Sequence, residues 1–259
     1  MKPFWVGTSW KMNKNAEEAN VWIDTVTRYL QSRSCSNQAF VIPPFPYIAQ
    51  VSHIARTTGV LVGAQNMCWE EEGAFTGEIS PHMLKDCGAD IVEIGHSERR
   101  HLFGETDETV NKKVLSALEN GLRPLVCVGD TRQEKQWQVS AESVIRQVKI
   151  ALHNVPRERL ADVVIAYEPV WAIGENGVPA TEQEAEDIHK AIRSALSASY
   201  GRETAESMYL LYGGSVNHSN ASGLLKQANV DGIFAGRSAW CAKDFCGLID
   251  LAEKEYEKQ

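Results

Sequence analysis

The chain has 259 residues, of which 43% are hydrophobic and 23% charged, and its formal net charge is −8. These values are ordinary for a globular protein, and the acidic balance argues against a nucleic-acid-binding surface. No run of 18 apolar residues predicts a membrane span, and the N-terminal segment lacks the pattern of a signal peptide. The six cysteines form no Cys-x-x-Cys pair, so we expect reduced thiols, no structural zinc site and a cytoplasmic protein.

Short apolar runs recur along the whole chain, and several are apolar throughout, as strands buried on both faces are. In chain order these expected strands are Phe4–Ser9, Ala39–Ile42, Leu61–Gln65, Ile91–Ile94, Pro124–Val128, Val163–Tyr167, Tyr209–Tyr212 and Gly232–Ala235. Amphipathic segments between them predict helices, among them Ala16–Gln31, Glu105–Asn120, Ala141–Asn154, Glu182–Tyr200 and Asn217–Gln227. Thr181 begins a capping-box pattern, and Gly59, Gly88 and Gly121 stand where helices are expected to end.

Eight strands alternating with helices in about 250 residues predict an α/β fold of the (β/α)8 barrel type. A doubly wound open sheet is the alternative. No Pro/Gly/Ser-rich linker divides the chain, so we expect residues 1–259 to form a single domain. Active sites of such barrels lie where the strands end. The candidate segments are therefore Ser9-Trp10-Lys11, Gln65-Asn66, Gly95-His96, Glu168-Pro169, Gly213-Gly214-Ser215 and Gly236-Arg237-Ser238.

Three of these positions carry groups suited to acid–base chemistry. His96 ends a strand before a helix expected from about Asp107, and a nearby helix N-terminus favours the neutral imidazole. Glu168 lies among apolar neighbours, whose desolvating effect raises the pKa of a carboxyl group toward that of a useful base. Lys11 could present a positive charge to an oxyanion. Taken singly, each residue has a structural alternative. Lys11 could be a surface lysine with a buried stem, His96 a structural histidine, and Glu168 a structurally paired glutamate.

Two glycine-containing turns follow the last two expected strands. Gly213-Gly214-Ser215 precedes an expected helix, and Gly236 follows the next strand. Barrel enzymes often bind phosphate there, through backbone N–H groups and a helix N-terminus. Each turn alone could be no more than a tight turn, but the two together predict an anion site.

Four motifs, in order and at matching spacing, resemble the signatures of the triosephosphate isomerase family. They are Trp10-Lys11-Met12-Asn13, Gly95-His96-Ser97-Glu98-Arg99-Arg100, Tyr167-Glu168-Pro169-Val170-Trp171-Ala172-Ile173-Gly174 and Tyr212-Gly213-Gly214-Ser215-Val216. The resemblance covers essentially the whole chain. It implies a TIM barrel that binds a small phosphorylated sugar without a metal or an organic cofactor.

The resemblance also implies roles for individual residues. Glu168 would move a proton between adjacent carbons, neutral His96 would polarise the carbonyl group, and Lys11 would stabilise the enediolate. The phosphate contacts would come from Gly174, Gly214, Ser215, Gly236 and Arg237, and the segment from Pro169 to Pro179 would act as a closing lid.

The segment Gly73–Ser80 resembles the family's third βα loop, which reaches into a neighbouring subunit. Gln65, Asn66, Thr76 and Glu78 match that pattern, so the resemblance implies a homodimer with twofold symmetry. The apolar insertion Met67-Cys68-Trp69 is expected to be buried at that interface.

The chain departs from the family pattern at three places. Ser9 stands where the first motif usually has asparagine, the lid reads Gly174-Glu175-Asn176-Gly177-Val178-Pro179 instead of the usual Gly-Thr-Gly-Lys, and Arg237 replaces the second of two paired glycines. Drift within a true triosephosphate isomerase would explain these changes without a new substrate. The lost asparagine and the altered lid together favour a different substrate, because Ser9 leaves space beside the reacting carbons and places a polar group there.

A four-carbon substrate fits that space. The first motif resembles the family branch that acts in tetritol catabolism, which implies conversion of L-erythrulose 1-phosphate to D-erythrulose 4-phosphate. The alternative substrate pair is dihydroxyacetone phosphate and glyceraldehyde 3-phosphate. A lyase that releases phosphate from the enediolate and a non-catalytic sugar-phosphate-binding protein are the remaining hypotheses.

Overall fold

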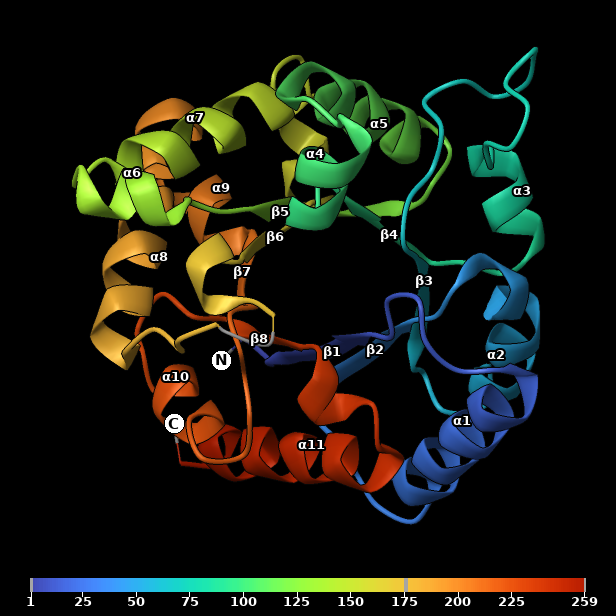
Figure 1. Cartoon of the computed structure of the whole chain (residues 1–259). Helices are drawn as coiled ribbons and strands as arrows, with labels where there is room; N and C mark the ends of the chain where they lie inside the picture. The colour runs from blue at the N-terminus through green and yellow to red at the C-terminus, as the bar shows by residue number, and fades with distance from the viewer. Residues whose placement is uncertain (1, 175–176, 259) are drawn as a thin grey trace.

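The computed structural model describes residues 2–174 and 177–258, and parallel strands form a closed barrel at its centre (Figure 1). Each strand pairs with the next, and the first pairs with the last to close the ring. The strands are β1 (Trp5–Ser9), β2 (Gln38–Ile42), β3 (Leu61–Ala64), β4 (Ile91–Ile94), β5 (Arg123–Val128), β6 (Val164–Tyr167), β7 (Tyr209–Tyr212) and β8 (Gly232–Ala235). The (β/α)8 prediction is confirmed, and the doubly wound sheet is wrong.

Helices surround the barrel (Figure 1). They are α1 (Ala16–Gln31), α2 (Ile48–Ala55), α3 (Pro81–Asp86), α4 (Ser97–Phe103), α5 (Asp107–Glu119), α6 (Arg132–Gln136), α7 (Ser140–Ala151), α8 (Glu182–Tyr200), α9 (Arg202–Ser207), α10 (Ala221–Leu225) and α11 (Ala242–Tyr256). Short 3-10 turns add η1 (Phe45–Tyr47), η2 (Arg157–Asp162), η3 (Val170–Ala172) and η4 (Arg237–Ala239). Among the described residues, no helix combines the length and apolar composition needed to cross a membrane.

Local sequence explains where these helices begin and end. Thr181 caps α8 through the expected capping box with Glu184, which satisfies backbone N–H groups that the first turn leaves unpaired. Gly59, Gly88 and Gly121 adopt positive φ angles of 70°, 80° and 67°, a conformation that glycine adopts at little cost. Gly88 and Gly121 directly follow the C-caps of α3 and α5, so these two helix ends are confirmed. The expectation for Gly59 was wrong, because α2 ends at Ala55 and a turn separates it from Gly59.

The barrel separates two apolar cores. Strand residues that point outward, such as Val92 and Ile94, pack beneath the helices, while Ile91 belongs to a smaller cluster inside the barrel. Because successive side chains of a strand point to opposite faces, Glu93 shares the inward face with Ile91. Gly7 leaves room inside for the Phe40 ring, which a Cβ atom would approach to 1.9 Å. This apolar packing fills the inside of the barrel, and polar side chains lie where the strands end.

The helix expected from about Asp107 is confirmed as α5, but the sequence analysis missed α4, which begins at Ser97 directly after His96. The helix predicted at Asn217–Gln227 is shorter and spans Ala221–Leu225, because Asn217 and Asn220 form side-chain hydrogen bonds in the preceding turn.

Candidate active site

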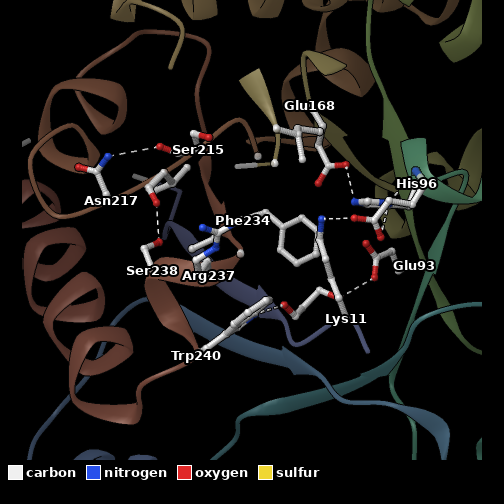
Figure 2. Close-up of a pocket in the computed structure, with 18 residues that line it drawn as sticks. Lys11, Glu93, His96, Glu168, Ser215, Asn217, Phe234, Arg237, Ser238 and Trp240 are labelled. Carbon is white, nitrogen blue, oxygen red and sulfur yellow. Dashed lines mark hydrogen bonds and ion pairs between the residues drawn. The ribbon is translucent and has the colours of Figure 1, made fainter. Parts of the chain in front are cut away.

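A cavity of about 510 Å³ opens where the strands end (Figure 2). It brings together most of the site residues predicted from the sequence, from segments far apart in the chain: Ser9, Lys11, His96, Glu168, Gly174, Ser215, Gly236 and Arg237. Gly214 is predicted but does not line the cavity. It is buried beside Tyr212 instead, where a Cβ atom would lie 2.5 Å from the tyrosine oxygen.

Glu168 lies at the end of β6 with its carboxyl group buried in this cavity. Its backbone N–H donates to the Val128 carbonyl at 2.8 Å, and Gly213 leaves space for its side chain, since a Cβ atom there would lie 2.7 Å from Glu168 Cγ. Burial, and then the negative charge of Glu93, raise the pKa of Glu168 to about 8. Its Oε2 atom forms no hydrogen bond within the described part of the chain. An unpaired carboxylate oxygen in such a place is suited to accept a proton from a ligand.

His96 faces Glu168 from the N-cap of α4 (Figure 2). Its Nδ1 atom accepts the Glu98 backbone N–H at 3.1 Å, and this hydrogen bond assigns the ring proton to Nε2. The Nε2 atom lies 3.4 Å from Glu168 Oε2. Burial, together with the positive charge of Lys11, lowers the pKa of His96 to about 4. The imidazole is therefore a neutral N–H donor at physiological pH.

Lys11 follows β1 in a left-handed conformation, with φ of 52°. Gln65 Nε2 donates to its carbonyl oxygen at 2.8 Å, and the Lys11 ammonium donates to Glu98 Oε1 at 2.7 Å. Burial acts to lower the pKa of Lys11, but its hydrogen bond to Glu98 and the charges of Glu168 and Glu93 outweigh burial and raise that pKa. A permanent positive charge therefore faces both buried carboxyl groups.

Glu93 is a site residue that the sequence prediction missed. It projects from β4 into the cavity, is 3% exposed, and accepts a hydrogen bond from Ser9 Oγ at 3.0 Å. Burial raises the pKa of Glu93 to about 7. The signal was present in the sequence, because Glu93 is the one charged residue in the apolar run Ile91–Ile94. A charged residue in a buried strand is unusual unless a partner or a function compensates its desolvation.

The opposite side of the cavity is built from turns. Ser215 adopts a positive φ of 51°, and its hydroxyl donates to the Ala172 carbonyl. Ser238 Oγ donates likewise to the Val216 carbonyl, so the two turns and η3 are tied to one another. The Arg237 side chain is exposed beside them. Backbone N–H groups and a guanidinium at one end of a cavity suit an anion.

The expected lid begins as a well-anchored segment. Val170 N–H donates to the Asp130 carbonyl at 2.9 Å, and Trp171 Nε1 donates to the Asp130 carboxylate at 3.0 Å. Glu175 and Asn176, which carry part of the departure from the family pattern, lie outside the described residues.

The sequence predicts no metal site, although the cavity contains carboxyl and imidazole groups that can act as metal ligands. Ligand atoms of Glu93, His96 and Glu168 all lie within 4.8 Å of one another. The Lys11 ammonium already supplies positive charge to this space, so a cation would have to compete with it. The absence of a cofactor stays a prediction.

Comparisons with known proteins place this geometry in a family. A family model described as triosephosphate isomerase matches residues 4–252. An L-erythrulose-1-phosphate isomerase of Rhizobium etli is 47% identical over 247 residues, covering 95% of this chain and 91% of that protein. One of Brucella abortus is 46% identical over 250 residues, covering 96% of each. A triosephosphate isomerase of Thermoanaerobacter is 44% identical over 245 residues, covering 95% of this chain and 98% of that protein. The chain belongs to the triosephosphate isomerase family.

Proposed function

We propose that this protein isomerises a small sugar phosphate by proton transfer, converting L-erythrulose 1-phosphate to D-erythrulose 4-phosphate. One observation carries the reaction class: the unpaired Oε2 atom of Glu168 faces the protonated Nε2 atom of His96 at 3.4 Å, and both side chains are buried. The names of the Rhizobium and Brucella relatives support the four-carbon substrate.

In the proposed mechanism, ionised Glu168 removes the proton from C3 of the substrate, and the electron pair moves into the C2–C3 bond. His96 donates its Nε2 proton to the C2 carbonyl oxygen and then recovers a proton from the C3 hydroxyl group. Glu168 returns its proton to C2, so the carbonyl group has moved to C3. Neutral imidazole is the better partner here, because its weak acidity matches that of an enediol more closely than imidazolium does.

Lys11 is proposed to stabilise the negative charge that develops on the two oxygens of the enediolate. Its ammonium group is held by Glu98 at 2.7 Å, and a positive charge fixed before the reaction loses no energy in reorganising during it. The substrate phosphate is proposed to bind at the other side of the cavity, near Gly174, Ser215, Gly236 and Arg237. Gly214 would act indirectly, by allowing the turn to pack against Tyr212.

Triose phosphates remain the second candidate, supported by the triosephosphate isomerase relative at 44% identity. A comparison of kcat/KM on the purified protein separates the two. We expect a higher value for L-erythrulose 1-phosphate than for dihydroxyacetone phosphate or glyceraldehyde 3-phosphate. Equal values, or a preference for the trioses, would reject the four-carbon assignment. Release of inorganic phosphate as the main product would instead identify a lyase.

We also propose a single-domain homodimer in the cytoplasm. Met12 and Phe103, 95% and 68% exposed, line a cavity of about 170 Å³ together with Lys11 and His96. Exposed apolar groups gathered at one place favour contact with another chain. The expectation that Met67 and Cys68 are buried at this interface was wrong, since they are 0% and 4% exposed within their own chain. The hydrogen bond from Cys68 N–H to Ile79 O folds them inward. Trp69 is half-buried, and its burial at the interface stays a prediction. Sedimentation showing only monomer at micromolar concentration would refute the dimer.

A further inference from the structure

Ser9 and Glu93 form a buried polar pair that the proposed proton transfer does not use. Ser9 lies at the end of β1 and Glu93 on β4, and both are 3% exposed. Ser9 Oγ donates to Glu93 Oε2 at 3.0 Å, and the Ser9 backbone carbonyl is held by Trp240 Nε1 at 3.0 Å. Both residues line the main cavity beside Lys11 and His96. The pair is therefore fixed in place and accessible to a ligand in the cavity.

The Glu93 carboxylate retains capacity for a further hydrogen bond. Its Oε2 atom accepts from Ser9, whereas its Oε1 atom faces the Cys127 thiol, a weak donor, at 3.9 Å. An ionised carboxylate can accept about four hydrogen bonds, and leaving that capacity unused in a buried place is costly. A hydroxyl group arriving with the substrate would compensate that cost.

The position of Glu93 matches one part of a four-carbon substrate. Ligand atoms of Glu93, His96 and Glu168 lie within 4.8 Å of one another, so Glu93 adjoins the space between base and imidazole where the reacting carbons must lie. L-Erythrulose 1-phosphate carries a hydroxymethyl group on the carbon that Glu168 deprotonates, and its hydroxyl oxygen is two bonds from that carbon. A triose phosphate has only hydrogen there.

We propose that Ser9 and Glu93 form a subsite for this terminal hydroxyl group, in which Glu93 accepts the substrate O–H and Ser9 orients the carboxylate. This inference rests on the proposed four-carbon substrate. It makes Glu93 a specificity-determining residue, with no proton transfer of its own. It also explains why the chain keeps a carboxyl group inside an apolar barrel, where a hydrophobic side chain would be more stable.

The test compares wild type, Glu93→Gln and Glu93→Leu on three substrates: L-erythrulose 1-phosphate, its analogue with a methyl group in place of the hydroxymethyl group, and dihydroxyacetone phosphate. Rates are taken on the alkaline plateau, so that changes in the ionisation of Glu168 do not enter. A hydrogen bond to a charged group contributes roughly 10- to 100-fold. We expect Glu93→Leu to lower kcat/KM about 100-fold for the tetrulose and less than about threefold for the triose. For the tetrulose, we expect the kcat/KM of Glu93→Gln to lie between the values of wild type and Glu93→Leu.

The analogue isolates the contact itself. Wild type should prefer the hydroxymethyl substrate over the methyl analogue, and Glu93→Leu should abolish that preference. Ile91→Val is the matched control, because Ile91 lies on the same inward face of β4 and outside the cavity. It should leave the substrate ratios unchanged.

Several results would overturn the subsite. Equal losses of kcat/KM for tetrulose and triose in Glu93→Leu would mean that Glu93 only positions or tunes the base. No loss for either substrate would mean that Glu93 contacts neither. A shift in the Ile91→Val ratios as large as that of Glu93→Leu would point to a general packing effect. In these cases a wild-type preference for the tetrulose would still support the proposed function. A wild type that prefers the triose rejects the proposed function itself, and the subsite with it.

Discussion

The two sides of the cavity handle charge in different ways. On one side, the side chains of Glu93, His96 and Glu168 are buried, and burial shifts the pKa of each so that its neutral form is favoured. On the other, Ser215, Gly236 and Arg237 offer turns and an exposed guanidinium. The difference shows what each task requires: proton transfer needs groups whose protonation is tuned by a dry environment, whereas holding a permanent anion needs oriented donors close to water.

The largest effect should come from the buried side. Glu168→Gln keeps the shape of the side chain but removes its basicity, so we expect kcat to fall at least about 1,000-fold with little change in KM. Steady-state kinetics measures this, and an Arg237 variant on the other side of the cavity is the comparison. Undiminished turnover in Glu168→Gln would remove the assigned base.

Stability should depend on pH through the buried carboxyl group of Glu93. Its pKa in the folded state is raised from 4.5 to about 7, so ionising it costs stability as pH rises from about 4.5 and the full cost is present above about 7. Glu93→Gln should therefore gain unfolding free energy relative to wild type between pH 4.5 and pH 8, on the order of 3 kcal/mol. Denaturant titrations at fixed protein concentration measure it. A difference that does not change with pH would contradict the assignment.

The pH dependence of kcat/KM should also reflect a raised carboxyl pKa, that of Glu168. Burial and Glu93 raise the pKa of Glu168 to about 8, so kcat/KM for the triose substrate should fall as pH drops below that value. His96, with its pKa lowered to about 4, adds no change near neutrality. Glu93→Gln removes a like charge and should move the acidic limb down by about one pH unit. An unmoved limb would mean that the two carboxyl groups do not interact.

The smallest effect should come from the exposed side. Arg237→Gln should raise KM about two- to fivefold and weaken its dependence on salt, with kcat nearly unchanged, because water and ions screen an exposed charge. Initial rates across a range of ionic strength measure this. A fall in kcat at constant KM would place Arg237 in the chemical step instead.

Local sequence patterns sufficed for the barrel and for much of the proposed site. Apolar runs located the strands, and residues after those runs located Lys11, His96 and Glu168 in one cavity. Such patterns work because strand ends of a parallel barrel converge on one face.

The features that were missed depend on the closed barrel. The unusual charge of Glu93 can be seen within its own apolar run, but its contact with Ser9, 84 positions away, follows only from strand pairing around the barrel. The burial of Met67 and the packing of Gly214 against Tyr212 likewise depend on contacts between segments. Periodicity within a segment carries no information about such contacts.

The most direct test of the proposed mechanism is turnover of L-erythrulose 1-phosphate in D2O, followed by NMR. A proton held by Glu168 exchanges with solvent, so D-erythrulose 4-phosphate should carry deuterium at the carbon that was the substrate's carbonyl carbon, and Glu168→Gln should show neither product nor deuterium within the same time. Isomerisation by wild type without solvent deuterium at that carbon, or deuterium incorporation by Glu168→Gln at the wild-type rate, would contradict proton transfer by Glu168.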